Sequence, residues 1–143
     1  MSHYFEKDVL EKGICFCLSN YFWGKGGLKV SDCVFCQIVN REIPAQILLE
    51  TKQVLAFKDI NPVAPVHIVL IPKKHISSVA DPQLIADPTL TTELFSAIQE
   101  LMGKADLKDG FRVVINRGKH AGESVPHLHL HLIGGRELAW PPG

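Results

Sequence analysis

With 143 residues, 46% of them hydrophobic and 21% charged, the chain has the composition of one compact globular domain and not of a disordered protein. Its 15 basic and 15 acidic side chains balance, which excludes the surplus of positive charge that binding to long nucleic acids requires. No apolar run approaches the roughly 18 residues of a membrane span, so no membrane partner is expected.

The four cysteines form two tight pairs, Cys15-x-Cys17 and Cys33-x-x-Cys36. Pairs so close along the chain cannot easily join distant parts of a fold, which argues against a secreted disulfide framework. We therefore expect a reducing compartment and a cytoplasmic protein.

Residues 1–30 differ in character from the rest and are expected to form an N-terminal extension, with the domain spanning residues 31–143. The apolar stretch at residues 14–23 is about as long as a signal-peptide core, but acidic residues precede it and no small-residue cleavage site follows. Organelle targeting is therefore less favoured than a helix packed on the domain or a loosely ordered extension. The glycine-rich residues 24–27 indicate a linker.

The remaining segments predict an α+β fold. Asp32 can cap a short helix over residues 33–40, whereas residues 59–65 and the Asp81-Pro82 pair belong to loops. Asp87 followed by Pro88 opens one strong helix with apolar residues at three- and four-residue spacing. Strands are predicted at residues 47–49, 54–58, 66–71, 112–116 and 125–133. This order fits a five-stranded antiparallel sheet with two main helices beside it.

The last predicted strand carries a row of histidines at every second position: His127, His129 and His131. Alternate side chains of a strand share one face, so the histidines are expected on one face and the intervening leucines on the other. Such a row can supply zinc ligands, or it can supply a neutral imidazole that acts as a nucleophile. A polar strand facing solvent is the structural alternative.

The loop before this row favours the nucleophile. Gly118, Gly122 and the following Glu-Ser-Val turn place backbone N–H groups and a hydroxyl just ahead of the histidines. A phosphate group with developing negative charge needs several donors of this kind.

The sequence of residues 127–133 resembles the His-φ-His-φ-His-φ-φ pattern of the histidine triad (HIT) superfamily, where φ is apolar. Further segments fall in the order and spacing of the Hint branch: Ala56–Ile60, Pro65–His67, Ile71–Ile76, Asn116, Gly122–Val125 and the Trp-Pro-Pro-Gly ending at 140–143. The similarity covers about residues 32–143.

This resemblance implies a HIT-like fold, a homodimer whose two sheets join, and a purine nucleoside phosphoramidase or nucleotidyl hydrolase. The ligands implied are purine nucleotides such as AMP, GMP and adenosine phosphoramidates, and no metal is needed for catalysis. Two alternatives stay open: a dinucleoside polyphosphate hydrolase, and a nucleotide-binding regulatory dimer with little turnover. The Trp-Pro-Pro-Gly ending favours the phosphoramidase.

By position in the motif, His129 is the implied nucleophile and His131 contacts the phosphate oxygens. His127 and His67 support them, and Ser124 binds the phosphate or the leaving amine. The implied nucleotide-binding residues are Val34, Phe35, Ile38, Phe57, Asp59, Ile60, Asn116, Gly122, Glu123, Ser124, His129 and His131, with Asp59 as the acid that binds the ribose.

Two residues depart from the family pattern. Glu123 stands where Hint members commonly have glutamine, and an ionised carboxylate there would repel a phosphate. Pro126 precedes the triad where a bulkier residue is common, and it removes one backbone donor.

The Cys33-x-x-Cys36 pair is a zinc half-site, because its spacing at the start of a helix puts both sulfurs on one side. Several HIT branches complete such a pair with two histidines, and the corresponding residues here are His75 and His127. The resemblance therefore implies a structural zinc site, separate from the reacting phosphorus.

Overall fold

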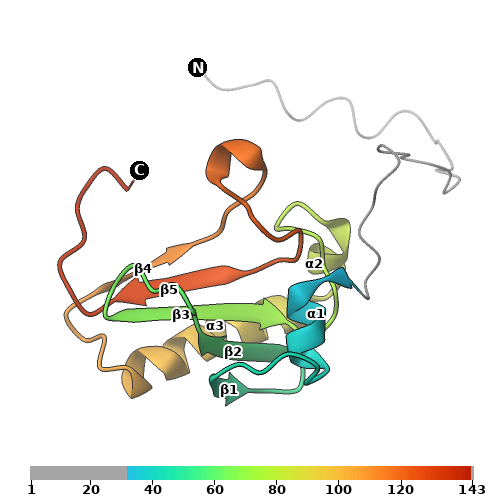
Figure 1. Cartoon of the computed structure of the whole chain (residues 1–143), viewed down its shortest axis with the longest axis horizontal. Helices are drawn as coiled ribbons and strands as arrows, with labels where there is room; N and C mark the ends of the chain where they lie inside the picture. The colour runs from blue at the N-terminus through green and yellow to red at the C-terminus, as the bar shows by residue number, and fades with distance from the viewer. Residues whose placement is uncertain (1–31, 143) are drawn as a thin grey trace, which may run out of the picture.

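The structure is a computed structural model that describes residues 32–142, so the predicted extension at 1–30 lies outside the described residues. Figure 1 shows one sheet flanked by helices. Along the chain the elements are α1 (Val34–Val39), β1 (Ile47–Glu50), β2 (Val54–Lys58), β3 (Val66–Pro72), α2 (Pro82–Ala86), α3 (Pro88–Lys104), β4 (Phe111–Val114), the 3₁₀ helix η2 (Lys119–Ala121) and β5 (Leu130–Gly134).

The five strands form one antiparallel sheet in the order β1-β2-β3-β5-β4. The predicted five-stranded antiparallel sheet is thereby confirmed. In the centre, β3 pairs with β5 so that His67 lies opposite Ile133 and Val69 lies opposite His131. Paired residues share a face, so His67 and His131 project from the same side of the sheet.

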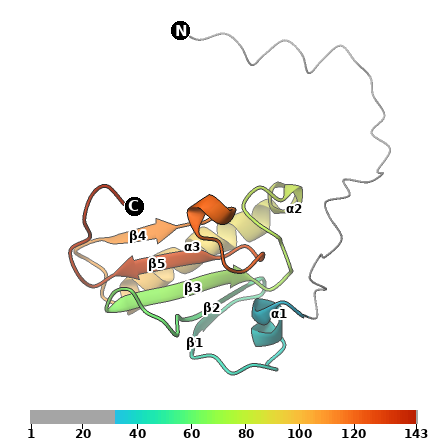
Figure 2. The same cartoon turned by 45° about the horizontal axis from the view of Figure 1, so that its top comes forward.

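Each face of the sheet has its own apolar cluster. On one face α3 packs through Leu90, Leu94, Ala97, Ile98 and Leu101, and Figure 2 shows this long helix running behind the strands. Leu128, Leu130 and Leu132 belong to that cluster, as the alternation of the histidine row predicts. On the other face α1 contributes Ile38, which packs with Leu55, Phe57, Val69 and Ile71. The candidate site is built on this α1 face.

The start of α3 agrees with the sequence prediction. The Asp87 carboxylate accepts a hydrogen bond from the Leu90 N–H, and Pro88 occupies the first turn. A side-chain cap satisfies one of the free N–H groups at a helix start, and proline gives up no bond there.

Several elements differ from the prediction. Residues 82–86 form α2 where a loop was expected, because Asp81 caps them by accepting from the Gln83 N–H. The cap residue of α1 is Cys33 and not Asp32. Strand β4 ends at Val114, which leaves Asn116 beyond the sheet.

Among the helices of residues 32–142, none combines the length and the apolar character needed to cross a membrane.

Leu101→Ala is expected to lower the free energy of unfolding by about 2–4 kcal/mol, because it leaves a cavity between α3 and the sheet. Leu101 is 1% exposed, whereas Phe95 of the same helix is 62% exposed. The matched control Phe95→Ala is therefore expected to change stability by less than about 0.5 kcal/mol. Chemical denaturation measures both, and equal effects of the two variants would contradict this packing.

Candidate active site

Strand β5 begins at Leu130, so only His131 of the three histidines lies within it. The predicted strand start at residue 125 is wrong. Pro126 has no N–H, and the His127 N–H turns back to the Val125 carbonyl at 2.9 Å, which bends the chain before the strand. The Leu128 N–H then bonds to the Ile76 carbonyl and fixes the approach to β5.

His127 is fully buried, and both its ring nitrogens have defined partners. Its Nε2 lies 2.9 Å from the Pro72 carbonyl oxygen. A carbonyl can only accept, so Nε2 carries the proton and Nδ1 has the lone pair. That lone pair faces the sulfurs of Cys33 and Cys36, at 3.4 and 3.6 Å.

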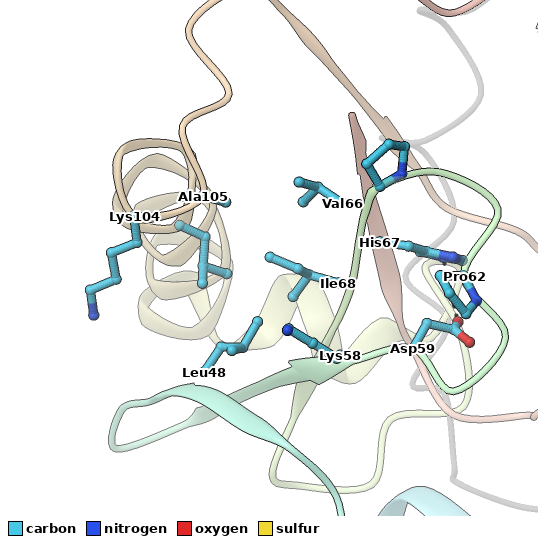
Figure 3. Close-up of a pocket in the computed structure, with 11 residues that line it drawn as sticks. Leu48, Lys58, Asp59, Pro62, Val66, His67, Ile68, Lys104 and Ala105 are labelled. Carbon is cyan, nitrogen blue, oxygen red and sulfur yellow. Dashed lines mark ion pairs between the residues drawn. The ribbon is translucent and has the colours of Figure 1, made fainter. Parts of the chain in front are cut away.

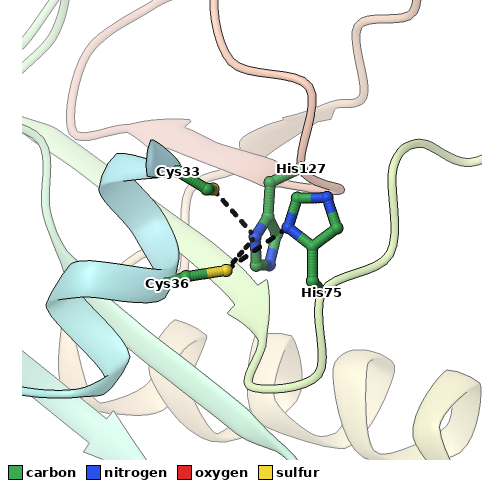
Figure 4. Close-up of side chains that lie close together, drawn as sticks. All are labelled: Cys33, Cys36, His75 and His127. Carbon is green, nitrogen blue, oxygen red and sulfur yellow. Dashed lines mark hydrogen bonds between the residues drawn. The ribbon is translucent and has the colours of Figure 1, made fainter. Parts of the chain in front are cut away.

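The side chains of Cys33, Cys36, His75 and His127 form a group that we call the metal cluster (Figure 4). Their potential ligand atoms all lie within 4.8 Å of one another, and Cys36 Sγ is 3.3 Å from His75 Nδ1. This group can hold a metal ion. Two thiols and two imidazoles are a donor set that suits tetrahedral zinc, and the Pro72 carbonyl orients the His127 ring as the partners of metal-bound histidines do.

Burial also affects the protonation of the metal cluster. It raises the pKa of the Cys36 thiol to about 11, with a further contribution from the adjacent Cys33. A thiol of this kind stays protonated at neutral pH unless a cation stabilises the thiolate, which a bound metal ion does.

His129 is 4% exposed, and its ring is held by the backbone of the same triad. Its Nδ1 lies 2.6 Å from the carbonyl oxygen of His127. Since that carbonyl must accept, Nδ1 carries the proton and the lone pair resides on Nε2. The structure thus gives His129 the tautomer that a nucleophile at Nε2 requires.

His67 and His131 are joined by a hydrogen bond of 2.9 Å between His67 Nε2 and His131 Nδ1. The Val63 N–H donates to His67 Nδ1 at 3.2 Å, so the proton of His67 must lie on Nε2. His131 Nδ1 then accepts a hydrogen bond from His67 Nε2–H, and His131 Nε2 carries an N–H that is available to a ligand. Burial lowers the pKa of His131, and the nearby His129 and His67 lower it further, so His131 is a neutral donor at pH 7.

The Asp59 carboxylate lies beside this pair of histidines. Its Oδ1 accepts from the Asn61 N–H, and its Oδ2 is 3.4 Å from His67 Nε2 and 3.9 Å from His131 Nδ1. These three side chains are close enough together for a metal site. His67 is a poor ligand there, however, because the Val63 N–H occupies its other nitrogen and keeps the proton on Nε2. We therefore describe these three side chains as a hydrogen-bonded group and not as a metal site.

The apolar residues predicted to wall a purine pocket divide into two sets. Phe35 is in ring contact with Phe57 and His129, at centroid distances of 5.9 and 5.3 Å, and Ile38 belongs to the same cluster as Phe57. Val34 and Ile60 are 37% and 89% exposed, so neither is part of the packed wall.

Residues 117–124 form a loop with its own internal bonds. Gly118 and Gly122 have φ values of 82° and 75°, which side chains disfavour, and the Gly122 N–H bonds to the Lys119 carbonyl. The Glu123 carboxylate accepts from the Gly118 N–H at 2.6 Å, so it closes the loop. Ser124 is exposed and Asn116 is half-buried in the segment that leads into the loop.

A cleft of about 460 Å³ opens beside the loop of residues 59–65 (Figure 3). Its other lining residues include Ile68, Leu101 and Ala105 on the α3 side of the sheet. Asp59 and His67 line this cleft, whereas Phe35, His129 and His131 do not, so the cleft adjoins the candidate site and lies mostly outside it.

The structure adds residues to the site that the sequence analysis missed. The carbonyl of Pro72 and the N–H of Val63 fix the tautomers of His127 and His67. Both act through the backbone, and no side-chain pattern in a sequence reports which backbone group a histidine contacts.

In the metal-free protein, the buried His127 is expected to cause a loss of stability between pH 6.5 and pH 4. Burial lowers its pKa to about 4, so as the pH falls the unfolded chain binds a proton before the folded chain does. Stability that is present above pH 6.5 is therefore expected to fall by about 3 kcal/mol on reaching pH 4. Denaturation at a series of pH values measures this, and His127→Gln should reduce the slope. A flat profile for the wild-type protein would contradict it.

Known proteins share this architecture. A family model described as the HIT domain matches residues 40–138. An uncharacterised HIT-like protein of Synechocystis is 47% identical over 114 residues, which cover 78% of this chain and 97% of that relative. An uncharacterised HIT-like protein of Synechococcus elongatus is 44% identical over 112 residues, which cover 78% of this chain and 97% of that relative.

Solved structures agree. A HIT family hydrolase from Legionella pneumophila superposes with a TM-score of 0.74 at 43% identity, covering 78% of this chain and 99% of that one. A histidine triad nucleotide-binding protein from Candida albicans gives a TM-score of 0.65 at 29% identity, covering 76% and 82%. The family model, the sequence relatives and the shared fold lead to one conclusion: the chain belongs to the HIT domain family.

Proposed function

We propose that the protein hydrolyses the P–N bond of purine nucleoside phosphoramidates through a nucleotidyl intermediate on His129. The observation that carries the proposal is the 2.6 Å contact between His129 Nδ1 and the His127 carbonyl. It keeps the lone pair on Nε2, where an imidazole attacks phosphorus without first losing a proton. A relative described as a HIT family hydrolase supports the reaction class.

The reaction proceeds in two displacements. His129 Nε2 forms a bond to phosphorus as the P–N bond breaks, and the amine leaves with that electron pair and takes up a proton. The nucleotidyl imidazolium keeps its Nδ1–H on the His127 carbonyl. Water then attacks phosphorus and loses a proton to solvent, and the P–Nε2 bond breaks to restore neutral His129. Ser124, on the exposed loop, is the group we assign to pass a proton from water to the leaving amine.

His131 is proposed to stabilise the negative charge on the phosphate oxygens. Its Nε2–H is the free end of the hydrogen bonds that run from the Val63 N–H through His67. Because burial lowers the pKa of His131, it donates as a neutral imidazole and keeps that proton. A fixed donor in a water-poor site is worth more than the same donor in water.

The nucleoside is proposed to lie on the α1 face, against Phe35, Ile38 and Phe57. Asp59 Oδ2 would accept from the ribose hydroxyls, since Oδ1 is already bonded to the Asn61 N–H. Asn116, Gly122 and Ser124 would contact the phosphate region. A relative described as a nucleotide-binding protein supports a nucleotide ligand.

We further propose a structural zinc ion at the metal cluster and a homodimer in which the two sheets join. The separations among Cys33, Cys36, His75 and His127 support the zinc ion. Strand β4 supports the dimer, because it is an edge of the sheet and Phe111 at its start is 37% exposed. Zinc bound to thiolates fits the cytoplasmic location that the cysteines favour.

The loop of residues 117–120 favours a second candidate substrate, a dinucleoside polyphosphate. Arg117 and Lys119 are exposed on this loop, a few residues before the triad. Cationic side chains at that place would suit a leaving group with phosphates of its own better than an amine.

His129→Ala is expected to lower kcat for an adenosine phosphoramidate by at least about 10³-fold, because it removes the attacking atom. His120→Ala is the control. It removes an exposed histidine and tests whether the loss of any histidine lowers turnover. Diadenosine polyphosphate is assayed in parallel. Turnover that survives His129→Ala would contradict the nucleophile, faster turnover of the polyphosphate would favour the second candidate, and tight binding without turnover would indicate a regulatory dimer.

Protein purified without chelator is expected to contain about one zinc ion per chain, and Cys36→Ser to lose it. Removal of the metal should lower stability. His129 is not a ligand of the metal cluster, so its Nε2 is not exposed to this loss directly. Elemental analysis with thiol titration makes the measurement. Metal-free protein in which Cys33 and Cys36 both titrate freely would contradict the zinc site.

A further inference from the structure

The loop of residues 59–65 buries little apolar side-chain surface. Ile60 and Val63 are 89% and 60% exposed, and Pro62 has no N–H to bond. Near its start the Asp59 carboxylate accepts from the Asn61 N–H, and at its far end Val66 pairs with Gly134 of β5. Hydrogen bonds, and not apolar burial, therefore determine where the Val63 backbone lies.

The Val63 backbone matters because its N–H sets two tautomers in succession. It donates to His67 Nδ1 at 3.2 Å, which places the proton of His67 on Nε2. His67 Nε2–H donates to His131 Nδ1, with 2.9 Å between the two nitrogens, and this leaves His131 with its own N–H on Nε2. If the Val63 N–H moved away, His67 could carry its proton on Nδ1, and His131 would lose the partner that selects its tautomer.

The carbonyl of the same residue is held by Arg136. Arg136 Nη2 donates to the Val63 carbonyl at 3.2 Å, while Nη1 donates to the Glu137 carbonyl at 2.8 Å. The guanidinium thus joins the segment after β5 to the exposed part of the 59–65 loop. A planar group with several donors suits two carbonyls better than the single ammonium of a lysine does.

Gly135 brings Arg136 to this place. It has a φ of 82°, a conformation that side chains rarely adopt, and it turns the chain directly after β5. A Cβ at this position would lie 3.1 Å from the Cβ of Pro65. The chain after β5 and the end of the 59–65 loop are therefore in close contact, within reach of the arginine side chain.

We infer that Arg136 is a positioning residue, which holds the Val63 backbone so that His67 and His131 adopt the tautomers in which His131 Nε2–H donates a hydrogen bond to a ligand. Four groups act in sequence: the Arg136 guanidinium, the Val63 backbone, the His67 ring and the His131 ring. Arg136 itself touches no ligand in this arrangement. The consequence for catalysis rests on the proposed function, whereas the effect on the tautomers does not.

Arg136→Met is expected to mix the tautomers of His67 and His131. In wild-type protein, ¹⁵N–¹H correlation spectra of the imidazoles should show protonated Nε2 and unprotonated Nδ1 for both residues. In the variant, both nitrogens of His67 should shift toward intermediate values. With an adenosine phosphoramidate, kcat should fall about threefold to tenfold, which corresponds to the loss of one hydrogen bond. KM should change less, because the Asp59–Asn61 bond is retained.

Arg112→Met is the matched control, because Arg112 donates to the Ala139 carbonyl at 2.7 Å on the same terminal segment and the structure records no bond from it to the 59–65 loop. It should leave both tautomers unchanged. Arg136→Lys, which keeps one donor, should restore part of the wild-type spectrum and part of kcat. Intermediate results in all three variants, including the control, would overturn the assignment to Arg136.

Two further outcomes would also overturn the inference: wild-type tautomers in Arg136→Met, or mixed tautomers with an unchanged kcat. Failure of the proposed function is a separate result. If wild-type protein does not turn over the phosphoramidate, the chemistry assigned to the site is wrong, and the spectra still decide whether Arg136 sets the tautomers.

Discussion

The hydrogen bond from His129 Nδ1 to the carbonyl of His127 is the constraint on which the site depends. It is short, at 2.6 Å, it is buried, and it leaves the lone pair of His129 on Nε2. The residue that supplies this carbonyl also places its side chain in the metal cluster, with Nε2 bonded to Pro72 and Nδ1 facing the two cysteines. One residue therefore connects the metal cluster to the group proposed to attack phosphorus. A change in the metal cluster that moves the His127 backbone would also move the carbonyl that orients the His129 ring.

The same kind of contact occurs at three histidines of the site, because a backbone group determines the tautomer of each one. A carbonyl orients His127, another orients His129, and an N–H orients His67, whose proton in turn orients His131. Backbone groups do not titrate, so they select the tautomer of each ring as long as that ring is neutral. The sheet supplies the register that brings these groups together, since β3 and β5 set His67 and His131 on one face. Burial lowers the pKa of His127 and of His131, which favours the neutral form of these two rings.

Much of the fold could be predicted from local patterns. Short apolar runs between turns predict the strands, and the Asp87-Pro88 start with three- and four-residue spacing predicts α3, because those signals lie within one element. Errors occurred where a short segment is decided by one bond, as at α2 with its Asp81 cap, or by a bend, as before β5. The metal cluster joins residues up to 94 positions apart: the spacing of Cys33 and Cys36 predicted half of it, and family resemblance suggested the two histidines. The tautomers and the role of Arg136 depend on backbone contacts that no pattern of side chains encodes.

The stereochemical course of the reaction tests the central claim most directly. A nucleoside phosphoramidate made chiral at phosphorus with sulfur would be hydrolysed in isotopically labelled water, and the configuration of the product determined. Two successive in-line displacements, the first by His129 Nε2 and the second by water, each invert phosphorus, so the account predicts net retention. Net inversion would mean that water attacks the substrate directly, and it would contradict a nucleotidyl intermediate on His129.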